Sequence, residues 1–393
     1  MKILALAHTV WTDRWLNRQQ LLSRIGRQLP ILYSNAPWYT WSRHDPRWGQ
    51  SPWFGLIELR DNVAVDVVPR WMTRSPRLSQ WDRWVVSRAA ARWRGWLESV
   101  GTGPLVLHLF HPEFEVYIEA LRPDRVVYHP YDLYEHMPGW TEWQHQAEQR
   151  ILEKADLIVT SSAVTAHRLE QRSGKPITLV HNGADTKLFA AARAAALPPP
   201  ADLAAIPEPR IGYIGSLQPT VDLLLLADLA RRHPEWHFVF VGDRSPTVDA
   251  VTEEGMRQCK TLANVHFLGM KPREQVPAYA LNMTVNILCW RVGQGFWADA
   301  AYPLKLHEYL ACGRSVVTSD LVAVRPFADM LRIAGDVDDW EHALGEAIAG
   351  RGPGTPQIRI ATAEQNSWDE RAEQLLAALR SMEKQAPSVG YQR

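Results

Sequence analysis

The sequence predicts an α/β protein built from two domains, each with a parallel sheet. Short apolar runs bounded by turn residues alternate with stretches of helical periodicity, which is the pattern of parallel strands joined by crossover helices. The chain has 393 residues, of which 46% are apolar, and this length suits two α/β domains of comparable size better than one core. A stretch that includes the consecutive prolines 198–200 separates two series of strands.

The first series of strands lies in residues 1–190, which are expected to form the first domain. Seven apolar runs predict its strands, at 2–8, 31–36, 63–69, 104–110, 126–132, 156–162 and 177–183. Polar residues follow several of these runs. Because ligands of open parallel sheets bind outside the carboxyl ends of the strands, these residues are candidates for a functional site.

The second half of the chain repeats the pattern. Residues 191–209 contain the three prolines and no strand pattern, so they are interpreted as an inter-domain linker. A second domain is expected over 210–362, with strands predicted at 210–216, 237–243, 265–270, 284–290 and 315–320. The stretch 363–384 has a helical pattern and is long enough to pack back on the first domain.

Charge and cysteine content argue against several classes of protein. The 43 basic and 43 acidic residues cancel, so no net charge attracts the whole molecule to nucleic acid. Three cysteines, Cys259, Cys289 and Cys312, are an odd number without metal-ligand spacing, which predicts a reducing, cytoplasmic compartment and no metal site. The N-terminal apolar run is too short for a signal peptide, and no run approaches the roughly 18 apolar residues of a membrane span.

The densest chemical signal is PLKLHEYLACGRSVV, which begins at Pro303 and directly follows a predicted strand. Pro303 suits a first helical turn and Gly313 a helix end. Lys305 and Glu308 are three residues apart and share a face near the start of the helix, where the helix dipole and free N–H groups favour a phosphate. A lysine there can neutralise a diphosphate, while a carboxylate can accept hydrogen bonds from two ribose hydroxyls. The alternative is an exposed ion pair on an amphipathic helix.

This segment resembles the PxKxxEYLAxGxPVV signature of bacterial GT-B glycosyltransferases, in particular the group 1, family 4-like enzymes of polysaccharide and glycolipid assembly. Other segments agree in order: 210–243 is similar to the opening βαβ of their donor domain, and 264–290 to the base-binding turn and next strand. The stretches 151–169 and 180–189 resemble the end of their first domain. The resemblance implies two Rossmann-like domains whose sheets face a cleft, with a C-terminal helix that returns to the first domain.

The resemblance also implies roles for single residues. Lys305 matches the lysine that contacts the donor diphosphate, and Glu308 matches the glutamate that holds the ribose. Gly215 lies where backbone N–H groups approach a phosphate, although close strand-to-helix packing would also require a glycine. The same resemblance assigns the nucleotide base region to Gly242, Arg244, Gly269 and Met270, and the donor-sugar region to Asp299 and Tyr302.

The sequence departs from the family pattern at several positions. Many retaining relatives have a glutamate eight residues before Glu308, but Ala300 stands there, with Asp299 beside it. No basic residue follows the strand at 210–216, and HTVWTDRWLNRQQ replaces the N-terminal Gly-Gly turn. Retention or inversion of the anomeric centre therefore stays open.

Two strand ends of the first domain carry candidate catalytic residues. His111 lies in HLFHPEFE, while Asp132 and Glu135 lie in YHPYDLYEH. A transferase that activates a hydroxyl needs a base, or a group that orients the hydroxyl and the leaving phosphate. His111 is the first candidate and Asp132 the second, and both are expected to face the donor sugar across the cleft. The alternatives are a packing role for His111 and a surface role for Glu135.

Together these features predict a glycosyltransferase of the hexosyltransferase type. It would move a sugar from a UDP- or GDP-sugar to a hydroxyl of a saccharide or lipid-linked acceptor in cell-surface polysaccharide or glycolipid assembly, without a cofactor or metal. One alternative is a catalytically degenerate nucleotide-sugar-binding protein, in which Ala300 marks lost chemistry. A second is an NAD-dependent oxidoreductase, but Gly212 and Gly215 give only G-x-x-G where a dinucleotide site has G-x-G-x-x-G.

Residues 70–98 carry five tryptophans, seven arginines and two acidic residues, a local charge of +5. A helix there would place five residues on one side, namely Trp81, Val85, Ala89, Trp93 and Trp96, with Arg83 and Arg94 opposite. Tryptophan favours the lipid headgroup zone and arginine attracts anionic lipid. The stretch therefore predicts peripheral binding to the inner face of an anionic membrane. The alternative is that its tryptophans pack on the first sheet.

Overall fold

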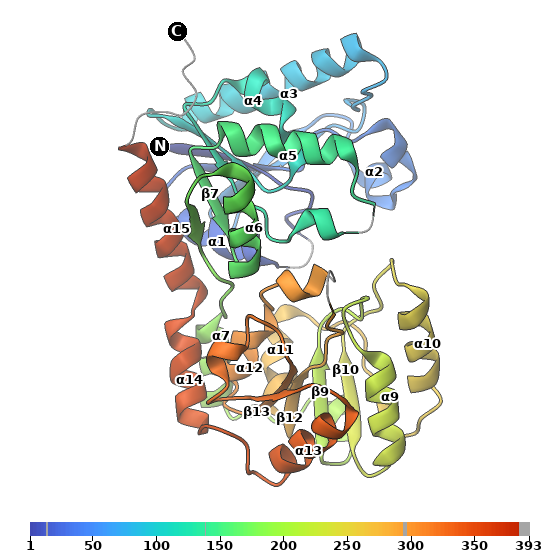
Figure 1. The fold of residues 1–393 in the computed structure, drawn as a ribbon. Coiled ribbons are helices and arrows are strands. Elements are labelled where there is room, and N and C mark those ends of the chain that lie inside the picture. Colours follow the sequence, from blue (N-terminus) through green and yellow to red (C-terminus); the bar gives the residue numbers. More distant parts are fainter. Residues whose placement is uncertain (13–14, 138, 294–296, 385–393) are drawn as a thin grey trace. The chain divides into compact units, whose positions relative to one another are not determined.

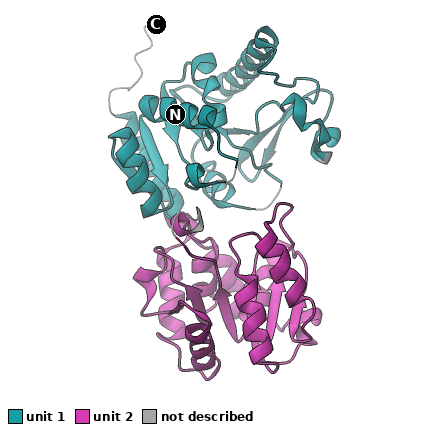
Figure 2. Cartoon of the chain, turned by 45° about the vertical axis from the view of Figure 1, so that its right-hand side comes forward, with its two compact units in different colours: residues 1–181, 371–393 teal, residues 182–370 magenta. Residues whose placement is uncertain are grey.

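The computed structural model describes residues 1–393 except 13–14, 138, 294–296 and 385–393 (Figure 1). The chain forms two compact units, unit 1 with residues 1–181 and 371–393 and unit 2 with residues 182–370 (Figure 2). Each unit has its own sheet flanked by helices. The prediction of an α/β protein with two Rossmann-like domains is confirmed.

Unit 1 is built on an eight-stranded sheet with the order β3-β4-β2-β1-β5-β6-β7-β8. Its strands are β1 (Lys2–Leu6), β2 (Ile31–Ser34), β3 (Leu56–Arg60), β4 (Val63–Val67), β5 (Leu105–Leu109), β6 (Arg125–Tyr128), β7 (Leu157–Thr160) and β8 (Ile177–Leu179). All neighbours are parallel except β3 and β4. The β3 strand was not predicted, because it is a mostly exposed edge strand without a buried apolar face. Asp61 and Asn62, both with positive φ, form its tight hairpin turn.

The helices of unit 1 cover this sheet. They are α1 (Asn17–Ile25), α2 (Pro46–Gln50), α3 (Ser79–Val100), α4 (Val116–Leu121), α5 (Glu142–Lys154), α6 (Ala163–Ser173) and the C-terminal helix α15 (Trp368–Glu383). Leu375 and Leu379 of α15 are fully buried, and Arg380 donates a hydrogen bond to Gln28 (2.9 Å) in unit 1. The predicted return of the C-terminal helix to the first domain is therefore confirmed.

The tryptophan-rich helix α3 packs differently from the sequence prediction. Val85, Ala89 and Trp93 are buried in the core of unit 1, and the indole N–H of Trp93 donates to Asp66 (2.6 Å). Arg92 also pairs with Asp66 (2.8 Å). The helical face assigned to a membrane is thus largely the face that packs on the sheet, because a buried indole and a lipid-facing indole give the same periodicity.

Unit 2 contains a six-stranded parallel sheet with the order β11-β10-β9-β12-β13-β14. Its strands are β9 (Arg210–Ile214), β10 (His237–Val241), β11 (Val265–Phe267), β12 (Val285–Leu288), β13 (Ser315–Ser319) and β14 (Arg332–Ala334). Its helices are α7 (Thr186–Ala194), α8 (Ala201–Ala204), α9 (Leu223–Arg232), α10 (Ala250–Cys259), α11 (Val276–Leu281), α12 (Lys305–Ala311), α13 (Val337–Ile348) and α14 (Pro356–Gln365). The three-residue edge strand β14 was too short to predict.

The stretch interpreted as a linker is part of unit 2. Phe189 of α7, Leu203 of α8 and Ile206 are buried in the apolar core of that unit. The boundary therefore falls between residues 181 and 182, nine residues before the predicted end of the first domain. The three prolines interrupt the chain between two short helices, and the apolar residues around them pack on the second sheet.

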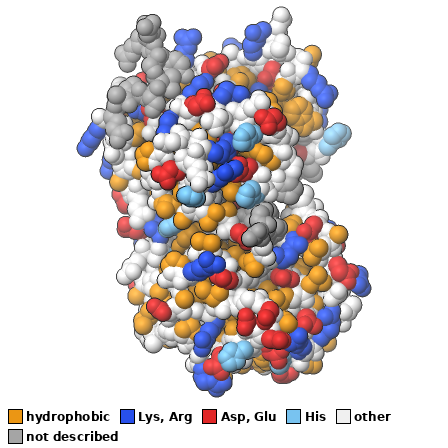
Figure 3. Space-filling model, viewed as in Figure 1, with side chains coloured by type: hydrophobic (Ala, Val, Ile, Leu, Met, Phe, Trp, Pro, Cys, Tyr) orange, Lys and Arg blue, Asp and Glu red, His pale blue; other side chains and the backbone are white. Residues whose placement is uncertain are grey.

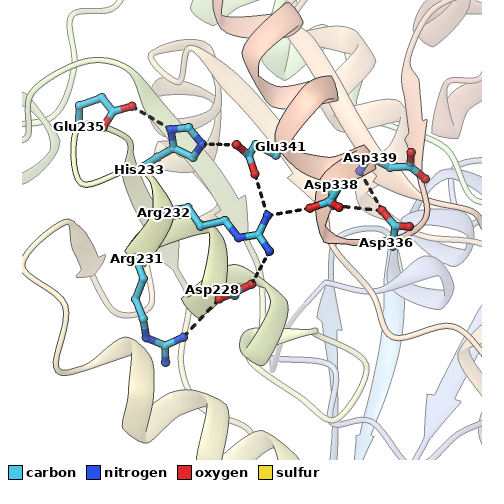
Figure 4. Close-up of polar contacts among 9 residues, drawn as sticks. All are labelled: Asp228, Arg231, Arg232, His233, Glu235, Asp336, Asp338, Asp339 and Glu341. Carbon is cyan, nitrogen blue, oxygen red and sulfur yellow. Dashed lines mark hydrogen bonds and ion pairs between the residues drawn. The ribbon is translucent and has the colours of Figure 1, made fainter.

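A network of ion pairs joins α9 to α13 on unit 2 (Figure 4). Arg232 pairs with Asp338 (2.7 Å) and Glu341 (2.9 Å), while His233 lies between Glu235 (2.9 Å) and Glu341 (3.0 Å). Burial acts to lower the pKa of His233, but hydrogen bonds to the two glutamates raise it above its ordinary value. Exposed pairs contribute little individually, so the network mainly fixes how the two helices pack.

The surface mixes charges of both signs, as the balanced composition implies. Basic and acidic side chains alternate over the face shown in Figure 3, where neither sign forms a continuous patch. In the described part of the chain, every helix is too short or too polar to cross a bilayer.

Candidate functional site

The carboxyl ends of the strands in unit 2 gather three glycine turns. Gly215 follows β9, Gly242 follows β10 and Gly269 follows β11, and their φ angles are +143°, +147° and +68°. A Cβ atom on Gly242 would lie 2.2 Å from the carbonyl oxygen of Gly215. The first two turns are also tied by a hydrogen bond from the N–H of Leu217 to the carbonyl of Asp243 (2.9 Å). Only glycine allows so close an approach of the two backbones.

Lys305, the first residue of α12, extends over the first of these turns. A Cβ atom on Gly215 would lie 2.1 Å from its Cε and 2.5 Å from its Nζ. The ammonium lies 5.1 Å from the centre of the Tyr213 ring. Among the described residues, no side chain or carbonyl pairs with this half-buried ammonium. The lysine therefore presents an uncompensated positive charge at the strand ends.

Glu308 lies one turn further along α12 and is also half-buried. Burial raises the pKa of its carboxyl to about 7, against the opposing charges of Lys305 and Arg273. Its side chain accepts no hydrogen bond in the described part of the chain. The helix begins at Lys305, so Pro303 precedes the first turn instead of lying in it, while Gly313 follows the helix with the positive φ of a helix end.

The turns assigned to the nucleotide base lie side by side. The carboxylate of Asp243 accepts the backbone N–H of Met270 (3.0 Å), which joins the turn after β10 to the turn after β11. Met270 is exposed. Arg244 instead pairs with Glu253 of α10. The structure thus brings Gly242, Gly269 and Met270 together, whereas Arg244 forms an ion pair with a neighbouring helix.

The two residues assigned to the donor sugar have different environments. Asp299 accepts the backbone N–H of Gly293 (3.3 Å) in the loop before α12, of which residues 294–296 lie outside the described residues. Tyr302 is buried, and its hydroxyl lies 2.8 Å from Nε2 of His307. Its carbonyl accepts a hydrogen bond from Asn182 (2.7 Å). Tyr302 therefore supports the base of α12 from the interior of unit 2.

In unit 1, His111 follows β5 and caps a short 3₁₀ turn, Pro112–Phe114. Its Nδ1 accepts the backbone N–H of Glu113 (3.3 Å) and lies 3.0 Å from Nε2 of His8. Because a backbone N–H can only donate, Nδ1 is an acceptor and the neutral ring carries its proton on Nε2. Burial lowers the pKa of His111 to about 3, helped by His8 and Arg18. His111 is therefore a neutral hydrogen-bond donor at Nε2, a group that can orient a substrate oxygen.

Two residues that sequence reasoning did not single out complete this network. His8 follows β1, and its Nε2 lies 3.3 Å from a carboxylate oxygen of Glu113. Together with His111 they offer three ligand atoms within 4.8 Å of one another, the spacing of a metal site. The lone pair of His111 Nδ1 already accepts the Glu113 N–H, so this set fits a hydrogen-bonded network better than a metal ion.

His8 and Glu113 border a pocket in unit 1 with a volume of about 290 Å³. Its lining combines four aromatic residues with polar ones, among them His8, Asn35, Trp38, Tyr39, Trp41, Asp45, Arg47, Arg74, Glu113 and Phe114. Aromatic walls with a few convergent polar groups are typical of small-molecule sites. The pocket therefore adjoins the first catalytic candidate.

Asp132 lies in the turn after β6, the strand next to β5. Burial raises the pKa of its carboxyl to about 7, against the charge of Arg18. No group in the described residues donates a hydrogen bond to this carboxyl. Glu135, by contrast, pairs with Arg168 (2.5 Å) and Arg172 (3.6 Å). Asp132 is thus the acid with an unengaged carboxyl, and near neutral pH it can accept or release a proton.

We expect Gly215→Ala to disturb the unit 2 site in two ways. The positive φ of this position costs about 1–3 kcal/mol for a residue with a side chain. The new Cβ would also displace the end of Lys305, so binding of the nucleoside diphosphate expected from the motif, UDP or GDP, should weaken. Thermal unfolding and calorimetric titration measure the two effects. Gly345→Ala on α13, where a Cβ meets no atom within 4 Å, is the matched control; equal behaviour of both variants would refute the role of Gly215.

Two family models match the chain. The model described as Glycosyltransferase Family 4 matches residues 43–188, and the model described as Glycosyl transferases group 1 matches residues 208–349. The first match spans most of the unit 1 sheet, and the second spans all six strands of unit 2. The match in unit 2 includes Gly215, Lys305 and Glu308.

The chain is also similar to curated relatives over part of their length. It is 30% identical over 178 residues to the Bacillus subtilis protein named for teichuronic acid biosynthesis, the glycosyltransferase TuaH, with 44% of this chain and 43% of that protein covered. It is 26% identical over 248 residues to D-inositol 3-phosphate glycosyltransferase of Mycobacteroides abscessus, with 59% of this chain and 53% of that protein covered. The chain thus spans about half the length of these curated relatives.

Solved structures match the fold over nearly the whole chain. Anabaena Alr3699/HepE in complex with UDP and glucose superposes with a TM-score of 0.71 at 15% identity, covering 97% of this chain and 100% of that one. A UDP-forming trehalose-phosphate synthase of Burkholderia xenovorans superposes with a TM-score of 0.69 at 12% identity, covering 98% and 100%. With family models matching both halves and the fold in agreement, the chain belongs to the group 1 and family 4 glycosyltransferases and has their GT-B fold.

Proposed function

We propose that the protein transfers a hexose from UDP-sugar to a hydroxyl of a saccharide acceptor. The observation that carries the proposal is the unpaired ammonium of Lys305 over the Gly215 turn, with the unpaired carboxyl of Glu308 one turn along. A diphosphate supplies the charge that Lys305 lacks, and a ribose supplies hydroxyl donors to Glu308. The HepE complexes contain UDP or UDP-glucose, which favours uridine over guanosine as the base.

The reaction breaks the bond between the anomeric carbon and a phosphate oxygen and forms a bond to the acceptor oxygen. Negative charge gathers on the departing UDP, where Lys305 stabilises it. The proton of the acceptor hydroxyl goes to Asp132, the acid with a pKa near neutrality. The Nε2–H of His111 donates to a sugar oxygen and orients it.

We further propose a role in the assembly of cell-surface polysaccharide or glycolipid, with a saccharide or lipid-linked acceptor. TuaH is named for teichuronic acid biosynthesis, and the relative from Mycobacteroides abscessus is named for D-inositol 3-phosphate. The competing function is sugar-nucleotide binding without catalysis, since Ala300, where many relatives have glutamate, is buried and inert. Turnover of UDP-sugar distinguishes the two, because a degenerate protein would bind UDP and release no sugar.

The first test of the donor site changes its two charged residues. Lys305→Ala should lower kcat by about 10²–10³-fold, the usual effect of removing one electrostatic stabiliser of a transition state. Glu308→Gln should weaken UDP-glucose binding by about tenfold, because a hydrogen bond to a carboxylate contributes about 1.5–3 kcal/mol. Wild-type affinity should rise with pH through about 7, as the carboxyl of Glu308 loses its proton and becomes a full acceptor. The glutamine variant should show no such rise.

Calorimetric titration and steady-state kinetics measure these effects. Lys260→Ala and Glu274→Gln, both at exposed positions of unit 2, are the matched controls and should behave like the wild type. Wild-type turnover in Lys305→Ala, or equal UDP-glucose affinity of the glutamate and glutamine forms at pH 8, would contradict the proposed donor site.

The second test concerns Asp132 as the proton acceptor. At saturating donor and acceptor, kcat should increase with pH through about 7, because only the deprotonated carboxyl can take the proton. Asp132→Asn should lower kcat by about 10²–10⁴-fold and abolish this dependence while UDP affinity stays unchanged. Glu119→Gln, an exposed change on α4, serves as the control. An asparagine variant that retains the pH dependence would assign it to another group.

We propose that the protein binds a membrane through a smaller surface than the whole of residues 70–98. Three exposed tryptophans form a cluster, Trp71, Trp81 and Trp84, and Leu78 is exposed close to them in sequence. The rings of Trp81 and Trp84 are 5.1 Å apart, and those of Trp71 and Trp84 6.0 Å. Arg77, Arg83 and Arg88 are exposed nearby in sequence and pair with no described residue. Indoles beside unpaired arginines suit an anionic lipid surface, which would bring a lipid-linked acceptor within reach of unit 1.

Cosedimentation with vesicles tests this surface. The wild type should bind vesicles that contain phosphatidylglycerol and not pure phosphatidylcholine, and added salt should release it. The double change Arg83→Gln and Arg88→Gln should weaken binding by more than about tenfold, since each basic residue near the surface contributes about 1 kcal/mol. The control pair Arg27→Gln and Arg257→Gln removes the same charge elsewhere. Binding that responds equally to both pairs would mean that no specific surface is involved.

A further inference from the structure

Arg18, the second residue of α1, is a buried cation whose hydrogen-bonding capacity is unused. Its side chain is 1% exposed, and its Nε and Nη1 atoms are buried without a hydrogen-bond partner in the described part of the chain. The guanidinium lies over the ring of Tyr131, 4.1 Å from its centre. That contact favours the positive charge but satisfies none of the N–H groups. A buried charge without a counter-ion is costly, so a ligand that supplies one would be bound strongly.

The charge of Arg18 lies among the residues proposed for the chemistry of unit 1. It helps to lower the pKa of His111 and opposes the rise in the pKa of Asp132. These residues follow β5 and β6, and α1 follows β1, the strand that pairs with β5. The sheet order reverses at β1, which has β2 on one side and β5 on the other. In open parallel sheets, ligands bind at such a reversal, outside the carboxyl ends of the strands.

The start of α1 adds two features that point to the same kind of ligand. The helix has nine residues and no acidic residue in its first turn. The side-chain oxygen of Gln19 accepts the backbone N–H of Leu16 (3.1 Å), but no described carboxylate neutralises the positive end of the helix. Asn17, beside Arg18, is also buried, and its Oδ1 accepts no hydrogen bond from any described residue. A ligand that fits both side chains has an anionic group for Arg18 and a hydroxyl donor for Asn17.

The described residues supply no anion to this guanidinium. Among the described residues, Asp132 influences Arg18 through its charge but forms no ion pair with it, and Glu113 lies against His8. The proposed donor has its own cation, because Lys305 of unit 2 serves the diphosphate. A second oxyanion, carried by the other substrate, would provide the negative partner of Arg18 in unit 1.

We infer that Arg18 binds a phosphate or carboxylate group of the acceptor, so that the enzyme selects an acidic saccharide. The planar guanidinium matches either oxyanion with two parallel hydrogen bonds. The side-chain oxygen of Asn17 accepts a hydrogen bond from a hydroxyl of the same sugar, and this places the neighbouring hydroxyl near His111 and Asp132. That this sugar is the acceptor rests on the proposed glycosyl transfer, whereas the binding of an acidic sugar by Arg18 does not.

Calorimetric titration of the full chain saturated with UDP tests the inference without turnover. The ligands are D-glucuronate, glucose 6-phosphate and neutral D-glucose, at one ionic strength because exposed charges are screened by salt. At least one acidic sugar should bind about tenfold or more tightly than glucose, since a charge-assisted pair is roughly twice as strong as a neutral one. Arg18→Gln should reduce this preference to none. Arg18→Lys should keep part of it, because lysine carries the charge without the planar fork.

Arg27→Gln, at an exposed position just after α1, removes the same charge nearby and should leave the preference intact. Thermal unfolding is the control for folding: removal of an unpaired buried cation in Arg18→Gln or Arg18→Met should leave the midpoint at or above that of the wild type. If the glutamine variant does not fold, the lysine and methionine variants take its place in the titration.

Three outcomes would overturn the inference. The first is that the wild type binds no acidic sugar better than glucose, and the second is that Arg18→Gln keeps the preference. The third is that Arg18→Gln loses UDP affinity and nothing else, which would assign the charge to the donor. Failure of the wild type to bind UDP, in contrast, would refute the proposed function, while titration of the UDP-free chain with the same acidic sugars could still support binding by Arg18.

Discussion

The close contact between the glycine turns after β9 and β10 is the constraint on which the donor site depends. A Cβ on Gly242 would overlap the backbone carbonyl oxygen of Gly215 at 2.2 Å, whereas a Cβ on Gly215 would displace the end of Lys305, and both positions have positive φ. The space left above Gly215 is filled by the aliphatic end of Lys305, which is therefore held at the strand ends by packing and needs no ion pair to fix it. A lysine positioned in this way keeps its charge available for a substrate phosphate.

In unit 1, large aromatic side chains and not glycines pack after the first strand. Where relatives have a Gly-Gly turn after the first strand, Trp11 is buried, contacts the ring of Tyr33 at 5.0 Å and donates its N–H to Asp61 (3.0 Å). Several of the 18 tryptophans are explained by such packing, among them Trp93 in α3. Aromatic filling makes the strand ends of unit 1 poorly solvated, and burial accordingly shifts the pKa values of His111 and Asp132 toward their neutral forms.

The sequence revealed the elements whose pattern comes from burial on both faces, and it missed those that depend on tertiary context. Largely apolar, fully buried runs such as 105–109 identify central parallel strands, whereas β3 is mostly exposed and its sequence has no such run. Lys305 and Glu308 could be found because a motif surrounds them. Arg18 carried no comparable signal: it lies in a polar-looking segment, and only the packing of α1 on the sheet buries it. Periodicity placed Trp93 on a helical face but could not tell core from lipid.

The two candidate sites share one electrostatic arrangement. Each combines a half-buried carboxyl whose pKa is about 7, Asp132 or Glu308, with a cation close enough to oppose that shift, Arg18 or Lys305. In neither case do the described residues close the pair into an ion pair or hydrogen bond. Direct pairing would stabilise the empty protein, but a ligand would then have to break it. Keeping the partners apart leaves the folded state less stable without substrate and lets substrate binding recover that free energy. Such a cost is understandable at a binding site, and it is harder to explain for residues with a purely structural role.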